Sequence, residues 1–107
     1  MENNEFTMAA MQIIASSGAA KSMFIEAIDK AIAGEIDEAN KALKEGRELF
    51  VEGHQVHANL LSNCANGFIQ PDLLLVHAQD QMSSAETIEV IASKIILMYK
   101  KNETACK

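Results

Sequence analysis

The amino-acid sequence predicts an all-α fold, in which three long helices form an antiparallel bundle within a single domain. Three observations support this prediction. The chain has 107 residues, a length that suits one domain better than two. Of these residues 49% are apolar and 22% are charged, so there are enough apolar side chains for one hydrophobic core. It contains only five glycines and one proline, so turn-forming residues are scarce. Two short breaks separate three blocks of about 30 residues, each longer than an average strand or helix.

The first predicted helix covers residues 5–33 and ends at the break Gly34-Glu35. Its apolar positions recur at spacings of three, four and seven, which indicates one helical face. These positions are Ile14, Ala15, Gly18, Ile25, Ile28 and Ile32.

The second predicted helix covers residues 35–66. It begins near Glu35 or Asp37, and Asp37 is a candidate cap, because acidic residues in the first turn are favoured by the helix dipole. It ends at Asn66-Gly67, where glycine can adopt the left-handed conformation that stops a helix.

The third predicted helix covers residues 71–101 and opens at Pro71, a residue suited to the first helical position. Between Leu73 and Met98 its apolar residues occupy much of the circumference rather than one stripe. A helix of that kind is sheltered on more than one side, so the pattern predicts self-association.

Charge and hydropathy narrow the class of protein. The formal net charge is −6, which argues against a nucleic-acid partner, because such binders use lysine and arginine to displace counterions from phosphates. The uncharged residues 6–20 follow Glu2 and Glu5 rather than a basic patch, so no export signal is predicted. No run of about 18 apolar residues is present, so we expect a cytoplasmic protein that is not embedded in a membrane.

One end of the predicted bundle lacks fixed charge. From Gly53 to Pro71 there is no lysine, arginine, aspartate or glutamate, and after Asp72 the gap continues to Asp80. The end of the second helix and the start of the third meet at this end, and all three histidines lie in or near it. It is therefore a candidate docking or active site, although a simple polar cap rich in Asn, Gln and Ser fits the same composition.

His77 is the most informative of the histidines. Asp80 at i+3 and Gln81 at i+4 share its helical face, and Ser83 or Ser84 follow within two turns. A neutral imidazole is nucleophilic near pH 7 and can accept a phosphoryl group, whose oxygens Gln81 or a serine hydroxyl would bind. From the spacing alone, an ordinary histidine with an incidental aspartate neighbour is the commoner explanation.

His54 and His57 stand at i, i+3 on the second predicted helix. With Asp80 they suggest a three-ligand metal site, but such a pair is common on helix surfaces. The preferred interpretation is that they pack in the bundle or lie beside His77 across it.

The run Leu73-Leu74-Leu75-Val76-His77-Ala78-Gln79-Asp80 closely resembles the LxLVHAQD motif of enzyme IIA proteins of the lactose/cellobiose/chitobiose family. These proteins belong to the bacterial phosphoenolpyruvate-dependent sugar phosphotransferase system. Two further stretches resemble the family's first and second helices, so the likeness extends over nearly the whole chain. The matching residues are Ile13-Ile14, Ser17-Gly18 and Ala20-Lys21-Ser22 in the first helix, and Gly53-His54 in the second.

The resemblance implies a phosphoryl relay. The residue that matches the family's acceptor is His77, which would take a phosphoryl group from phospho-HPr and pass it to a cysteine of enzyme IIB. Supporting roles are expected for Gln81 and His54. The resemblance also implies a homotrimer, in which Asp80 gathers on the three-fold axis and binds one Mg²⁺ ion per trimer. Converging carboxylates repel one another unless a cation bridges them.

One position departs from the family pattern. The family often has a second histidine four residues after the acceptor, where this chain has Gln81. We expect Gln81 to donate a hydrogen bond to the phosphoryl group but to bring no positive charge near it.

Two other classes of function remain open from the residues. A helical oligomerisation adaptor without chemistry would need no reactive histidine. A histidine phosphotransfer domain of two-component signalling has a lysine at i+3 from its histidine, where this chain has Asp80.

Overall fold

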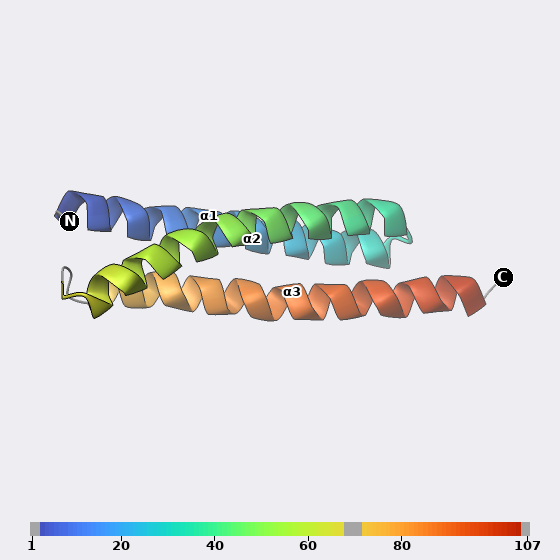
Figure 1. Ribbon diagram of the computed structural model, residues 1–107. Helices are drawn as coiled ribbons and strands as arrows, with labels where there is room; N and C mark the ends of the chain where they lie inside the picture. The colour runs from blue at the N-terminus through green and yellow to red at the C-terminus, as the bar shows by residue number, and fades with distance from the viewer. Residues whose placement is uncertain (1–2, 68–71, 106–107) are drawn as a thin grey trace.

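Three long helices lie side by side in the computed structural model, which describes residues 3–67 and 72–105 (Figure 1). They are α1 (Asn3–Ile32), α2 (Ile36–Ala65) and α3 (Leu73–Ala105). The bundle is a rod of 59 × 18 × 18 Å, in which α2 runs antiparallel to α1 and α3. The predicted all-α, three-helix architecture is confirmed. In the part of the chain that the structure describes, no helix is apolar enough over sufficient length to cross a membrane.

A tight turn joins α1 to α2. Gly34 has φ 84°, a left-handed conformation that favours glycine, and its N–H donates to the carbonyl of Ala31 at 3.0 Å. The N–H of Ala39 donates to the carbonyl of Glu35 at 2.9 Å, so Glu35 occupies the capping position of α2. The candidate cap Asp37 lies instead inside the first turn, where its charge favours the helix dipole.

The end of α2 and the start of α3 form the opposite end of the rod. Gly67, at φ 79°, follows α2 as predicted. Asp72 caps α3, since its Oδ1 accepts a hydrogen bond from the N–H of Leu75 at 3.0 Å. The third helix therefore begins at Leu73, later than predicted, and Pro71 lies outside the described residues.

Small residues on α2 let it approach α1 closely. Ala39, Gly46 and Gly53 are buried at intervals of seven residues, which keeps them on one side of the helix. A Cβ atom at Gly53 would come within 3.1 Å of the Cβ of Ser16, and one at Gly46 would overlap the ring of Phe24. The glycines therefore fill a role that any larger residue would disrupt.

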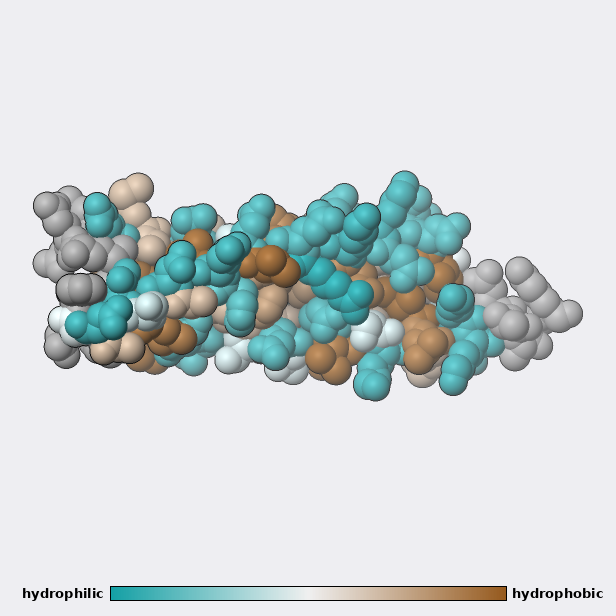
Figure 2. Space-filling view, in the orientation of Figure 1, coloured by the Kyte–Doolittle hydropathy of each residue, from teal (hydrophilic) through white to brown (hydrophobic). Residues whose placement is uncertain are grey.

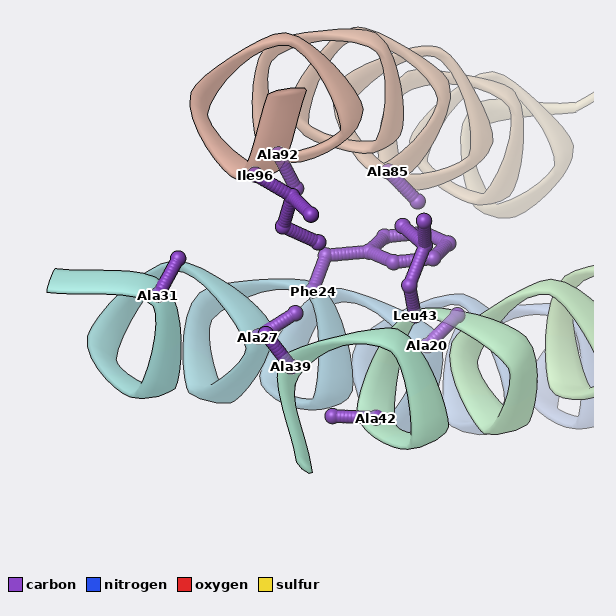
Figure 3. Close-up of a cluster of buried hydrophobic side chains, with 10 residues drawn as sticks. All are labelled: Ala20, Phe24, Ala27, Ala31, Ala39, Ala42, Leu43, Ala85, Ala92 and Ile96. Carbon is purple, nitrogen blue, oxygen red and sulfur yellow. The ribbon is translucent and has the colours of Figure 1, made fainter. Parts of the chain in front are cut away.

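Two clusters of buried side chains hold the helices together. Figure 3 shows the first, in which the fully buried ring of Phe24 reaches from α1 toward α3. Its other members are Ala20, Ala27, Ala31, Ala39, Ala42, Leu43, Ala85, Ala92 and Ile96. The second cluster lies at the end where α3 begins, and contains Phe6, Ile13, Leu60, Leu75, Ala78 and Met82. The prevalence of alanine in the first cluster accounts for the slenderness of the rod.

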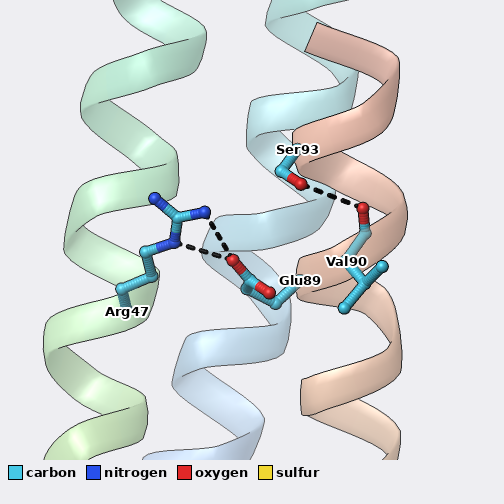
Figure 4. Close-up of polar contacts among 4 residues, drawn as sticks. All are labelled: Arg47, Glu89, Val90 and Ser93. Atoms are coloured by element: carbon cyan, nitrogen blue, oxygen red, sulfur yellow. Dashed lines mark hydrogen bonds and ion pairs between the residues drawn. The ribbon is translucent and has the colours of Figure 1, made fainter. Parts of the chain in front are cut away.

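An ion pair spans the less tightly packed side of the bundle. α1 packs extensively against both other helices, whereas α2 and α3 meet less. Between them Arg47 Nε and Nη2 lie 2.7 and 2.6 Å from Glu89 Oε1 (Figure 4). In the same view the hydroxyl of Ser93 donates to the carbonyl of Val90 within α3. Because the Arg47 side chain is about half exposed, we expect the pair to stabilise the fold by at most about 1 kcal/mol.

Helix α3 exposes many large apolar side chains. Figure 2 shows brown, apolar atoms interrupting the polar surface along the edge of the rod where α3 lies. The residues are Leu73, Val76, Val90, Ile91, Leu97 and Met98. Exposed apolar side chains also occur on α1, at Met8, Met11, Ile25 and Ile32, and on α2, at Val51 and Leu61. Ile25 and Ile32 belong to the apolar face that the spacing indicated for the first helix, yet they are exposed in a single chain. All three helices thus present apolar surface to solvent, with the most on α3.

We predict that Gly46→Ala destabilises the protein, because the added Cβ overlaps the buried Phe24 ring. Overpacking of this kind lowers the free energy of unfolding by about 1–3 kcal/mol. The matched control is Gly18→Ala in α1, where a Cβ meets nothing within 4 Å. There the loss of glycine's excess chain entropy should leave stability unchanged or raise it by about 0.5–1 kcal/mol. Urea unfolding followed by circular dichroism measures both variants, and equal stabilities would contradict the assignment.

Candidate functional site

The inward residues of α3 determine where His77 points. Leu75, Ala78 and Met82 are buried in the core beside α1 and α2. Successive residues are about 100° apart around a helix, so His77 and Asp80 do not share the buried side of α3. Both side chains are exposed. The imidazole is therefore open to a visiting molecule without any unfolding of the bundle.

An open hollow of about 520 Å³ surrounds the histidine. It is lined by Leu73, Leu74, Val76, His77 and Asp80, all from the first two to three turns of α3. Three of these side chains are aliphatic, and Asp80 supplies the only charge. The hollow thus combines one nucleophilic ring, one carboxylate and an apolar floor, a composition suited to docking a protein surface.

Gln81 forms the main polar link between α1 and α3 near this hollow. Its Oε1 accepts a hydrogen bond from Lys21 Nζ at 2.9 Å. The Gln81 side chain itself carries no charge, and the contact brings the ammonium of α1 to the residue four positions after His77. A hydrogen bond from Gln81 to the phosphoryl group stays a prediction. Sequence analysis included Lys21 only in a motif. The sequence does mark Lys21, because it is the only lysine or arginine among the first 29 residues.

His57 is held across the α2–α3 interface by Gln79. The side-chain amide Nε2 of Gln79 lies 3.0 Å from His57 Nε2. An amide nitrogen can only donate, so the ring nitrogen accepts and the imidazole is neutral. Burial lowers the pKa of His57 below its usual 6.5, and the nearby His54 lowers it further.

His54 lies away from the His77 hollow. Its ring stacks on Phe50, with centroids 6.0 Å apart and planes at 23°. It lines a second hollow of about 410 Å³ on the α2–α3 side, together with the Arg47–Glu89 pair. A supporting role for His54 therefore stays a prediction. The described residues that line the His77 hollow all come from α3.

The described residues contain no cluster of three His, Cys, Asp or Glu side chains able to hold a metal ion. The alternative of a site built from His54, His57 and Asp80 of one chain is therefore wrong. The hydroxyl of Thr87, on the same polar stripe as His77, donates to the carbonyl of Ser83 at 3.0 Å and so serves the helix itself.

Comparison with known proteins identifies the family. The family model described as "PTS system, Lactose/Cellobiose specific IIA subunit" matches residues 8–100, which is most of the chain. The chain belongs to this family. The predicted resemblance is confirmed.

The relatives agree in sequence and in fold. The lichenan-specific phosphotransferase enzyme IIA component of Bacillus subtilis (strain 168) is 36% identical over 100 residues, covering 92% of this chain and 91% of the relative. The crystal structure of PtcA from S. mutans superimposes with a TM-score of 0.88 at 32% identity, covering 94% and 99% of the two chains. The Escherichia coli IIA(Chitobiose), solved in complex with HPr, gives a TM-score of 0.81 at 25% identity, covering 96% and 99%.

Membership establishes the activity. The protein is a IIA component of the phosphotransferase system, a relay that carries phosphoryl groups from HPr to enzyme IIB in sugar uptake. The predicted phosphocarrier function is confirmed, and an adaptor without chemistry does not describe this chain.

Because the pKa of His57 is lowered in the folded protein, we predict that the protein becomes less stable as the pH falls. The unfolded ring binds its proton near pH 6.5, whereas the folded ring does so only at lower pH. Falling pH therefore favours the unfolded state, and stability is lost from about pH 6.5 down to the folded pKa. In His57→Gln, the new side chain keeps an acceptor for Gln79 but does not titrate.

Urea unfolding at about pH 7.5 and about pH 5.5, at fixed protein concentration, measures this loss. We expect a smaller difference between the two pH values in His57→Gln than in the parent protein. If stability changed equally between the two pH values in both proteins, the lowered pKa of His57 in the folded state would be contradicted.

Proposed function

We propose that His77 is the phosphoryl acceptor of this IIA component. The observation that supports the proposal is an exposed imidazole in an open, largely apolar hollow at the start of α3. A ring nitrogen attacks the phosphorus of phospho-HPr, and the N–P bond forms as the bond to the donor breaks. The thiolate of an enzyme IIB cysteine then attacks the same phosphorus, and the imidazole of His77 is released unchanged.

The composition of the hollow fits two successive protein partners. A phosphoryl group on His77 adds negative charge to a chain whose net charge is already −6. The aliphatic side chains of Leu74 and Val76 let the hollow attract partners by apolar burial, and they add no further like-charge repulsion. The solved complex of the Escherichia coli relative with HPr supports HPr as one partner, and family membership supports enzyme IIB as the other. We propose that the protein carries out this exchange in the cytoplasm.

The exposed face of α3 supports association into a homotrimer. Leu73, Asp80, Ile91 and Met98 follow one another at intervals of seven or eleven residues, which keeps them on one side of a helix. All four are exposed in the single chain. Packing this face against its copies around a three-fold axis would bury the apolar residues and bring the three Asp80 carboxylates together.

The same packing would build a cation site from three chains. Carboxylate oxygens are the ligands that Mg²⁺ prefers, and the exposed Asp80 side chain is available to supply one per subunit. The ion would offset the repulsion among the carboxylates and so tie metal binding to assembly. A site of this kind needs one Asp80 from each of three chains, so a single chain cannot contain it. This agrees with the absence of a metal cluster among the described residues.

We predict that His77→Gln cannot be phosphorylated. The protein is incubated with phosphoenolpyruvate, enzyme I and HPr, and its intact mass is measured before and after mild acid treatment. The parent protein should gain one acid-labile phosphoryl group. His54→Gln and His57→Gln should retain that adduct, because their rings lie outside the His77 hollow. An adduct on His77→Gln, or none on the parent protein, would overturn the assignment.

We predict that Asp80→Leu uncouples assembly from metal. Chelation by EDTA should shift the parent trimer toward smaller species in analytical ultracentrifugation, because the carboxylates then repel one another. Asp80→Leu should remain trimeric with and without EDTA, and the matched control Glu86→Gln, also exposed on α3, should respond like the parent protein. A chelator response in Asp80→Leu equal to that of the parent protein would remove Asp80 as a ligand.

A further inference from the structure

Lys21 lies in a position from which it can act on the group that His77 carries. Its Nζ donates to Gln81 Oε1 at 2.9 Å, in a half-buried contact between α1 and α3. Gln81 follows His77 by four residues, so their side chains are neighbours on α3, with Cβ atoms about 6 Å apart. The ammonium is thus bonded to a residue whose side chain neighbours His77 on α3.

Lys21 is the only lysine or arginine in residues 1–29 and 48–93 of the sequence. Residues 48–93, which include the end of α2 and the first two thirds of α3, contain none. Arg47 is paired with Glu89 at 2.6 Å, and Lys30, at the far end of α1, is 3.5 Å from Glu35. Lys21, by contrast, is bonded to a neutral amide, and the ion pairs found among the described residues do not include it.

We propose that Lys21 binds the phosphoryl group of phosphorylated His77 and that Gln81 is the positioning residue that holds the ammonium ready for it. This proposal rests on the proposed role of His77. The phosphoryl group presents three acceptor oxygens and a charge near −2. The ammonium has three donors, of which Gln81 uses one, and a flexible four-carbon stem that can follow the phosphoryl group.

This arrangement explains what a glutamine at position 81 does that a histidine would not. A histidine at position 81 would supply a cation only when protonated. Glutamine instead accepts a hydrogen bond from the Lys21 ammonium. The positive charge at the site therefore comes from α1 rather than from the side chain at position 81.

The first test compares Lys21→Met with the parent protein at equilibrium with a fixed ratio of phospho-HPr to HPr. Intact mass gives the phosphorylated fraction of each. We expect the equilibrium constant for phosphorylation to fall about tenfold in Lys21→Met, the factor set by about 1.4 kcal/mol from one charge-assisted hydrogen bond. Lys21→Arg should recover most of the loss, and Lys30→Met, which removes a cation from the other end of α1, should behave like the parent protein.

A second test reports on the phosphoryl group itself and bypasses HPr. His77 is phosphorylated with potassium phosphoramidate, and the phosphoryl group is titrated by ³¹P NMR. A neighbouring ammonium favours the dianion, so the phosphoryl pKa should be lower in the parent protein than in Lys21→Met. Gln81→Glu provides an independent check, because a carboxylate at position 81 neutralises Lys21 in place and should shift the titration in the same direction as Lys21→Met.

The outcomes separate the two proposals. A parent protein that gains no phosphoryl group on His77 contradicts the proposed acceptor. A parent protein that is phosphorylated, with Lys21→Met and Gln81→Glu matching it in both equilibrium constant and ³¹P titration, leaves the acceptor intact and overturns the role of Lys21. Sedimentation of each variant verifies that its oligomeric state matches that of the parent protein.

Discussion

Burial of Leu75, Ala78 and Met82 fixes the rotation of α3 about its own axis, and the placement of every functional group depends on that rotation. With these three side chains inward, His77 and Asp80 face outward, Gln79 faces α2, and Gln81 faces α1. A rotation of one residue would bury the imidazole and expose core side chains. The stability of the bundle and the accessibility of its nucleophile therefore have the same physical origin.

The architecture was predictable from sequence because it follows from local patterns. The apolar periodicity, the glycines at 34 and 67, and the scarcity of other turn formers specify three helices and two breaks. His77 was also singled out from sequence as the candidate acceptor, since a motif of adjacent residues marks it. The Lys21–Gln81 contact was not found, because it joins side chains 60 positions apart and depends on the rotation of two helices. The separation of His54 from the His77 hollow was missed for the same reason.

The distribution of charge suits a protein that carries a phosphoryl group between two partners. The chain is acidic overall, yet the hollow around His77 is largely aliphatic. The ammonium of Lys21 on α1 is held by the neutral amide of Gln81. Partners are thereby attracted through apolar burial, and Asp80 is the one carboxylate among the described residues that line the hollow. The apolar faces of α1 and α3 that remain exposed in one chain are available for further contacts.

The most direct test of the account is to observe the three imidazole rings during turnover. Protein labelled with ¹⁵N at histidine is followed by NMR while phosphoenolpyruvate, enzyme I and HPr are added. The account predicts that the ring nitrogens of His77 alone acquire the shift and ³¹P coupling of a phosphorylated imidazole, and that adding enzyme IIB reverses the change. Phosphorus coupling at His54 or His57, or a His77 ring that never changes, would contradict it.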